Sequence, residues 1–192
     1  MKFSTFSALV LAVLLSAAPA QAESVSAGFL TLDLLSGWEM KIYREFPNQV
    51  IVFLYSNKPP AGNELGIQFV TGQADVKGVG DTLEAQTRMV AGIHEHPEAP
   101  LNKISDTGLW FEAPPDGKDS GRRRTAVCFS GDRLIWYTIE AGSGRRPLDF
   151  KALPPQSRDE LIHIWKSLRV SNPLYQPLMD GCLEKLPPEF FQ

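Results

Sequence analysis

Two histidines flank a glutamate at His94-Glu95-His96, the densest group of side chains in the sequence that could bind a metal ion. A zinc site needs three or four ligands that converge on one point. Histidines two positions apart point to different sides of a helix, although they can converge on an extended turn. We therefore expect His94 and His96 to form a polar helix end, where histidine interacts favourably with the helix dipole. Metal binding by His94, His96 and a further acidic residue is the alternative.

The sequence has two arginine clusters, made up of Arg122, Arg123, Arg124, Arg145 and Arg146. The first cluster enters a predicted strand, Arg124–Ser130, and the second follows its predicted hairpin partner, Leu134–Glu140. Gly131-Asp132 between them is a tight-hairpin signal. Antiparallel pairing brings the two clusters together at one edge. Because arginine is favoured at interfaces and in carboxylate recognition, we predict that this edge binds another protein with an acidic surface. The alternative is a solvated strand edge on which charge prevents aggregation.

Signatures of catalytic and nucleotide-binding sites are absent from the sequence. It contains no Gly-x-Ser-x-Gly elbow, no phosphate-binding loop, no dinucleotide fingerprint and no EF-hand loop. Aspartates and glutamates are scattered along the chain, so paired carboxylates for glycoside cleavage stay an open alternative. We expect a protein that is not an enzyme and holds no cofactor, with a cell-wall hydrolase as a rival.

The N-terminus has the three parts of a secretory signal. A positive start, Met1-Lys2, precedes an apolar run from Ala8 to Ala18, and Pro19–Ala22 ends in an Ala-x-Ala pattern. This order predicts cleavage after Ala22. The apolar run is shorter than the roughly 20 residues that span a bilayer. We therefore expect a signal peptide over residues 1–22, no stable membrane insertion and a periplasmic location.

The two cysteines, Cys128 and Cys182, are predicted to form a disulfide. Secreted proteins meet an oxidising environment, and two cysteines allow a single pairing. Two buried free thiols are the alternative. The formal net charge of the chain is −3. This mildly acidic balance argues against nucleic acid as a partner, because phosphate contacts need a basic face.

Short apolar segments bounded by turn residues predict a β-rich chain. The expected strands are Gly28–Leu34, Trp38–Tyr43, Gln49–Tyr55, Leu65–Val70, Ile104–Phe111, Arg124–Ser130 and Leu134–Glu140. The run Gln49–Tyr55 is apolar at almost every position, which predicts a strand buried on both faces.

Two helices are expected from capping-box spacings followed by apolar stripes. Asp81 and Glu84 begin the first helix, which Pro97 follows. Ser157 and Glu160 begin the second. Both helices are amphipathic and would cover a sheet.

Hairpin-length loops between the expected strands predict a mainly antiparallel sheet. The fold class is therefore α+β, with the sheet covered by two principal helices. Residues 23–170 are expected to form one domain of ordinary size. Residues 171–192 are rich in proline and show no period, so we expect a tail that lies over the domain and is tied to it by Cys182.

The pattern as a whole resembles the PsbP-like domains, a family of secreted or lumenal α+β proteins. The residues that carry the resemblance are Gly37-Trp38, Val50–Tyr55, Leu65–Val70, the helix start Thr82-Leu83-Glu84 and the closing Leu161–Val170. The resemblance covers residues 25–170 and implies a sandwich of sheet and helices. It also implies a protein that acts by contact with other proteins, because members of the family are mostly non-enzymatic.

The sequence thus favours a non-enzymatic periplasmic protein that binds another protein. The most concrete form of this hypothesis is an immunity-type protein that neutralises a toxin effector, and the broader form is an accessory factor of the envelope. A periplasmic small-ligand or metal-binding protein is the rival from a different class.

Overall fold

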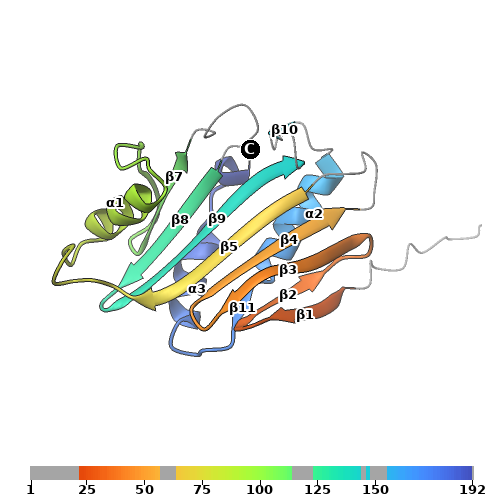
Figure 1. The fold of residues 1–192 in the computed structure, drawn as a ribbon, viewed down its shortest axis with the longest axis horizontal. Coiled ribbons are helices and arrows are strands. Elements are labelled where there is room, and N and C mark those ends of the chain that lie inside the picture. Colours follow the sequence, from red (N-terminus) through yellow and green to blue (C-terminus); the bar gives the residue numbers. More distant parts are fainter. Residues whose placement is uncertain (1–21, 57–63, 114–122, 144–145, 148–154, 192) are drawn as a thin grey trace, which may run out of the picture.

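The structure of the protein, a computed structural model, describes residues 22–56, 64–113, 123–143, 146–147 and 155–191. The expected signal peptide, apart from Ala22, lies outside the described residues, as do Arg122 and Arg145. The described chain forms two antiparallel β-sheets and three α-helices (Figure 1). The expected α+β class with antiparallel pairing is confirmed.

The large sheet has the strand order β3-β4-β5-β9-β8-β7-β6, and β10 pairs with β9 outside this path. Its strands are β3 (Trp38–Phe46), β4 (Gln49–Ser56), β5 (Glu64–Gln73), β6 (Asn102–Ser105), β7 (Gly108–Ala113), β8 (Arg123–Ser130), β9 (Arg133–Ser143) and β10 (Arg146–Pro147). The small sheet, in the order β1-β2-β11, consists of β1 (Glu23–Ala27), β2 (Leu30–Leu34) and β11 (Arg169–Val170).

The large sheet has a core on each face, because successive side chains of a strand point to opposite sides. On the inner face, Val52 of β4 and Ile67 of β5 are register partners and belong to the main core. On the outer face, Phe111 of β7 and Phe129 of β8 belong to a second core.

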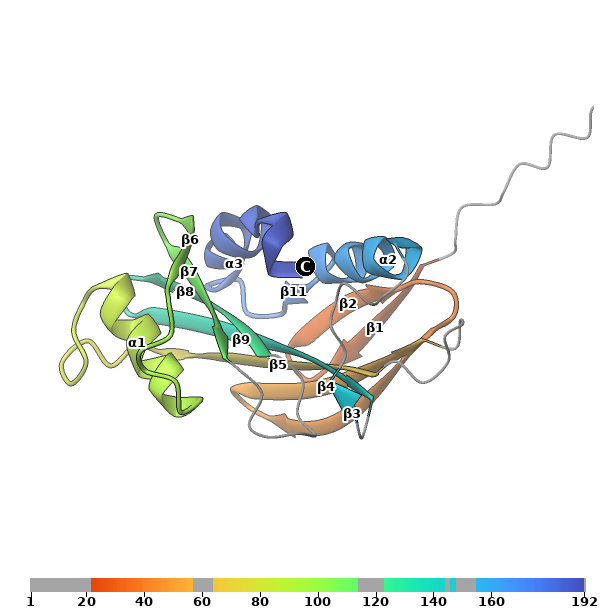
Figure 2. The same cartoon turned by 90° about the horizontal axis from the view of Figure 1, so that it is seen from above.

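The helices are divided between these two faces. They are α1 (Leu83–Ile93), α2 (Pro155–Lys166) and α3 (Gln176–Cys182), followed by the 3-10 helices η2 (Leu183–Lys185) and η3 (Pro188–Phe191). Figure 2 shows α2, α3 and the small sheet on one side of the large sheet, with α1 at its β7–β8 end. Three helices on two faces replace the two covering helices that the sequence predicted. None of the helices in the described ranges is long and apolar enough to cross a membrane.

The segment after Val170 contains regular structure that the sequence analysis did not predict. Leu178 and Met179 of α3 and Phe190 and Phe191 of η3 are buried and complete the main core. Pro177, which suggested an irregular tail, lies in the first turn of α3, where a proline costs no hydrogen bond.

Both longer helices begin at residues other than those expected. Thr82, not Asp81, is the N-cap of α1, and its hydroxyl accepts a hydrogen bond from the Ala85 amide at 3.1 Å. Helix α2 begins at Pro155, which places Ser157 inside the helix, where it is buried.

The predicted pairing of Cys128 with Cys182 is confirmed. Cys128 lies on β8 and Cys182 at the end of α3, and both are fully buried. The bond therefore fixes α3 to the inner face of the large sheet.

Candidate functional site

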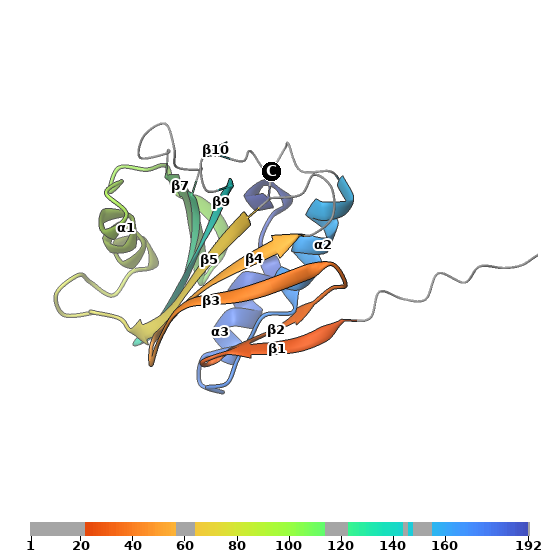
Figure 3. The same cartoon turned by 45° about the vertical axis from the view of Figure 1, so that its right-hand side comes forward.

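Figure 3 shows that, in the described part of the chain, no helix lies over the outer face of β3 and β4. This face carries aromatic side chains. Val50, Val52 and Leu54 of β4 point to the main core and are completely buried. Phe53 and Tyr55 alternate with them and are only half-buried. The expectation of a strand buried on both faces is therefore wrong, because α1 packs against β7 and β8 at the far end of the sheet.

A β-bulge in β3 adds a further ring to this surface. The register with β4 shifts between Ile42, which pairs with Val52, and Arg44, which pairs with Ile51, so Tyr43 is the extra residue. Bulges bend a strand and redirect a side chain. Tyr43 is 64% exposed and is thus directed into solvent beside β4.

The rings form a connected surface around a guanidinium group. Tyr43 and Phe53 are in edge contact, with ring centroids 5.5 Å apart, and Phe53 lies 6.5 Å from Tyr55. The guanidinium carbon of Arg44 lies 6.0 Å from the centroid of Tyr43 and 5.7 Å from that of Phe46. We call these five residues the aromatic surface. Contacts of this kind stabilise the arrangement by roughly 0.5–1 kcal/mol each.

The surface lies at the edge of the large sheet. Among the described strands, β3 has a partner on one side only, since it ends the strand order. Ile42, Tyr43 and Phe46, all on β3, are three of the five large apolar side chains that are exposed in the described ranges. Exposed rings on an edge strand are a liability for aggregation unless something binds there. The aromatic surface is therefore the strongest candidate for a binding site.

Of the arginines predicted to bind a partner, Arg124 is not exposed. Strand β8 lies between β7 and β9, so it is internal to the sheet. Arg124 is buried, and its Nε donates a 2.8 Å bond to Glu112 while Nη1 donates to the carbonyl of Phe190 at 3.0 Å. The assignment of Arg124 to a partner is corrected to an internal ion pair.

The other arginines divide into two groups. Arg123 is half-buried at the start of β8, and Arg146 belongs to β10, which pairs with the end of β9. The start of β8 and the end of β9 lie side by side, as the predicted hairpin requires. Arg122 and Arg145 fall outside the described residues.

The two histidines at the end of α1 contact the sheet. The Nε2 atom of His94 lies 3.3 Å from the hydroxyl of Thr138 on β9, and its ring lies beside Phe111 on β7. His96 is half-buried after the helix, and His163 is exposed on α2. Across the described ranges, no three His, Cys, Asp or Glu side chains are grouped as metal ligands.

Between these histidines, Glu95 has a left-handed backbone. Its φ is +64°, and its amide donates to the Gly92 carbonyl at 3.0 Å while the His96 amide donates to the Ala91 carbonyl at 2.9 Å. This is the Schellman ending, in which glycine is the usual residue. Replacing Glu95 by glycine should raise the free energy of unfolding by about 0.5–1 kcal/mol, because relief of strain exceeds the extra entropy of the unfolded chain.

Equilibrium urea unfolding measures this effect, and Glu98→Gly is the matched control. Glu98 is also an exposed glutamate near the helix end, but its φ is not positive. The control should therefore lose stability. Equal losses in both variants would contradict the strain at Glu95.

The aromatic surface was not predicted from the sequence, although its signal was present. The strand Gln49–Tyr55 is apolar on both faces, and Tyr43 and Phe46 continue apolar character along the preceding strand. Such a pattern does not distinguish a strand covered on both sides from one with an open apolar face. The position of α1, which packs against β7 and β8 at the far end of the sheet, shows that this face is open in the described part of the chain.

No family model matches the chain, and no curated protein matches it. Among solved structures, the chain is similar to cyanobacterial PsbP (CyanoP) from Synechocystis sp. PCC 6803, with 11% identity and a TM-score of 0.38 over 81% of this chain and 95% of that chain. It is also similar to a crystal structure from Bacteroides thetaiotaomicron VPI-5482, with 13% identity and a TM-score of 0.37 over 78% of this chain. The match spans 48% of the Bacteroides chain, about half of its length. The first of these two structures is a PsbP protein, the family that the sequence pattern resembles.

Proposed function

We propose that the protein acts outside the cytoplasm by binding another protein through the aromatic surface. The observation that carries the proposal is the exposure of Tyr43 and Phe46 on either side of Arg44, at the edge of the sheet. Tyrosine, phenylalanine and arginine are enriched at the centres of protein interfaces. The disulfide agrees with an oxidising compartment.

The arrangement suits a partner with an apolar patch and a carboxylate. The rings are held by strands and by mutual contacts, so little side-chain entropy is lost on binding. The planar guanidinium of Arg44, whose carbon lies 6.0 Å and 5.7 Å from the centroids of two rings, can donate two parallel hydrogen bonds to a carboxylate. The acidic partner expected from the sequence is therefore retained, at a different surface.

The most concrete form of this function is an immunity-type protein that covers the active site of a toxin effector. The broader form is an accessory factor of the envelope. The identity of the captured protein separates the two: a toxic enzyme supports the first, and a resident envelope protein supports the second.

The test is capture of a partner by residues 23–192 from envelope and secreted fractions, followed by affinity measurement with the purified partner. The double variant Tyr43→Gln/Phe46→Gln should weaken binding at least about tenfold, the loss of a modest hot spot. Arg44→Gln should weaken binding to an acidic partner and reduce its dependence on salt.

Ile93→Gln is the matched control, because Ile93 is 59% exposed at the end of α1, away from the aromatic surface. Its affinity should equal that of the unmodified protein. If the double variant binds as tightly as this control, the aromatic surface is not the binding site.

A further inference from the structure

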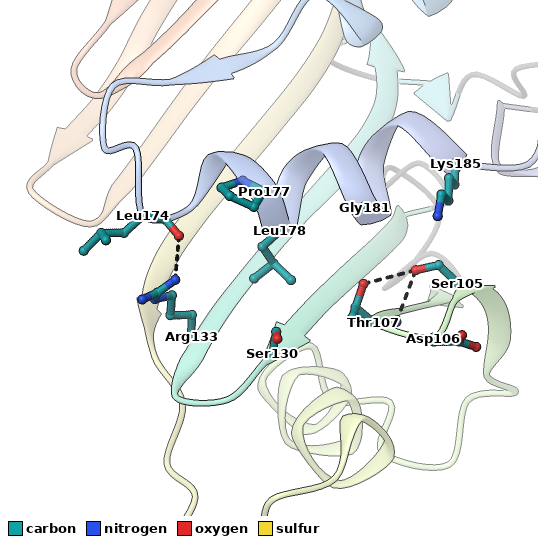
Figure 4. Close-up of a pocket in the computed structure, with 10 residues that line it drawn as sticks. All are labelled: Ser105, Asp106, Thr107, Ser130, Arg133, Leu174, Pro177, Leu178, Gly181 and Lys185. Carbon is teal, nitrogen blue, oxygen red and sulfur yellow. Dashed lines mark hydrogen bonds between the residues drawn. The ribbon is translucent and has the colours of Figure 1, made fainter.

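A second region, away from the aromatic surface, has the form of a small-molecule site. A cavity of about 330 Å³ lies between α3 and the turns that follow β6 and β8 (Figure 4). This volume is at the lower end of the range for small-molecule pockets. One wall is the helix, and the other is formed by hydroxyl-bearing residues at the strand ends.

The cavity exists because glycine, at position 181, occupies the centre of the face of α3 that lines it. Pro177, Leu178, Gly181 and Lys185 line the cavity, at spacings that place them on the same side of the helical segment. A Cβ atom at Gly181 would lie 3.6 Å from the hydroxyl of Thr107, an ordinary van der Waals contact. Any longer side chain at this position would occupy the cavity itself.

Two cations mark the ends of the cavity. Figure 4 shows Arg133 at one end and Lys185 at the other, with Leu178 between them. The Nη1 atom of Arg133 donates to the Leu174 carbonyl at 3.0 Å, which holds the guanidinium at the mouth of the cavity. A guanidinium has five N–H groups, so further donors remain for a ligand.

Two carboxylates, Asp106 and Asp132, lie near these cations. Asp106 forms a 2.8 Å ion pair with Lys103, and this lysine, with a smaller effect from Lys185, lowers the pKa of the Asp106 carboxyl. Asp132 lies 3.8 Å from Arg133, at the limit of an ion pair. The residues that line the cavity include two cations, Arg133 and Lys185, and one carboxylate, Asp106.

Hydroxyl groups supply neutral donors along the opposite wall. The Oγ atom of Ser105 accepts a bond from the Thr107 amide at 3.2 Å and lies 3.3 Å from the Thr107 hydroxyl. Only one of the two hydroxyl protons can lie between these oxygens. The other can be donated into the cavity, where an anionic oxygen would accept it.

We propose that this cavity binds a short aliphatic dicarboxylate. One carboxylate is bound by Arg133, and the alkyl chain contacts Leu178 and Pro177. The second carboxylate is bound by Lys185 and by a hydroxyl of Ser105 or Thr107. Two cations separated by an apolar wall match the charge pattern of such a ligand better than that of a monocarboxylate.

The test is titration of the protein, residues 23–192, with succinate, glutarate and adipate, followed by calorimetry and amide NMR shifts. Butyrate and hexanoate at equal ionic strength are the comparison ligands. At least one dicarboxylate should bind tenfold more tightly than the monocarboxylates and shift the amides of Thr107 and Gly181. Equal or absent binding of all five compounds would overturn the proposal.

Two substitutions at one position separate a loss of the cavity from a loss of the fold. Gly181→Leu should fill the cavity and weaken dicarboxylate binding at least tenfold, whereas Gly181→Ala should bind normally because its Cβ fits. Arg133→Gln and Lys185→Gln should each weaken binding by a similar factor. Unchanged binding by Gly181→Leu would place the ligand elsewhere.

The proposal is independent of the aromatic surface. Tyr43→Gln/Phe46→Gln should bind dicarboxylates as the unmodified protein does, and Gly181→Leu should bind the protein partner normally. Each proposal can therefore be tested even if the other fails.

Discussion

Replacement of Cys128 and Cys182 by alanine should lower the free energy of unfolding by about 4 kcal/mol. The two cysteines are 54 positions apart, so their bond closes a long loop in the unfolded chain. The chain-entropy relation for a loop of this length gives roughly 4 kcal/mol. Since domains are usually stable by about 5–15 kcal/mol, the variant should still fold, with a markedly lower urea midpoint.

Equilibrium unfolding measured by tryptophan fluorescence and circular dichroism tests this prediction. The single variant Cys182→Ala is the control, because it removes the bond but keeps the sulfur of Cys128 buried. If loop closure causes the loss, the single and double variants should be destabilised by similar amounts. A double variant within 1 kcal/mol of the unmodified protein would show that burial of α3 alone fixes the C-terminal segment.

The elements that the sequence predicted well are those with local signals. Gly131-Asp132 forms the expected two-residue turn, in which Ser130 pairs with Arg133 and Gly131 has a φ of +67°. The sequence of a hairpin turn is sufficient to predict it because only glycine and a few polar residues adopt such backbones at low cost. The cysteine pairing was equally constrained, since one pairing was possible.

Helix α3 was not predicted because its stability comes from the rest of the fold. It spans seven residues, fewer than the roughly 12–15 that a helix needs to persist alone. Its residues Leu178, Met179 and Cys182 are buried in the main core, and burial of these side chains selects the helical backbone. The cavity beside it could not be predicted for the same reason.

The sequence predicted an exposed Arg124 and a covered Phe53, and the structure corrects both. Hydrophobic periodicity shows which face of a strand is apolar but not which segment packs against it. Arg124 was assigned to solvent, yet its side chain lies between Glu112 and the C-terminal η3. Phe53 was assigned to a covered face, yet it is half-buried beside Tyr43. Both corrections depend on the packing of segments far apart in the sequence, namely η3 and α1.

Arg124→Met should lower the free energy of unfolding by about 2–3 kcal/mol. Removal of one member of a buried ion pair typically costs about 3–5 kcal/mol. A third of the Glu112 side chain is exposed and water can solvate it, so the expected loss lies at or below the lower end of that range. The substitution also leaves the Phe190 carbonyl without the donor that links η3 to β8. Hydrogen exchange in η3 should therefore accelerate more than in β4 or β5.

A double-mutant cycle with Glu112→Gln isolates the interaction energy between Arg124 and Glu112. The variant Arg124→Met/Glu112→Gln should recover part of the loss, because the carboxylate that has lost the Arg124 guanidinium is gone. Arg123→Met is the matched control, since Arg123 is the neighbouring arginine and is only half-buried. This variant should lose less stability than Arg124→Met.

The same variants distinguish an internal role of Arg124 from a role in binding. If Arg124 acts within the fold, Arg124→Met should bind the captured partner with unchanged affinity at a temperature where the variant is fully folded. Under the interface predicted from the sequence, affinity would fall while the free energy of unfolding stayed the same. An internal role therefore predicts a loss of stability without a loss of affinity, and an interface role predicts the reverse. The bonds from Arg124 to Glu112 and to the Phe190 carbonyl favour the internal role.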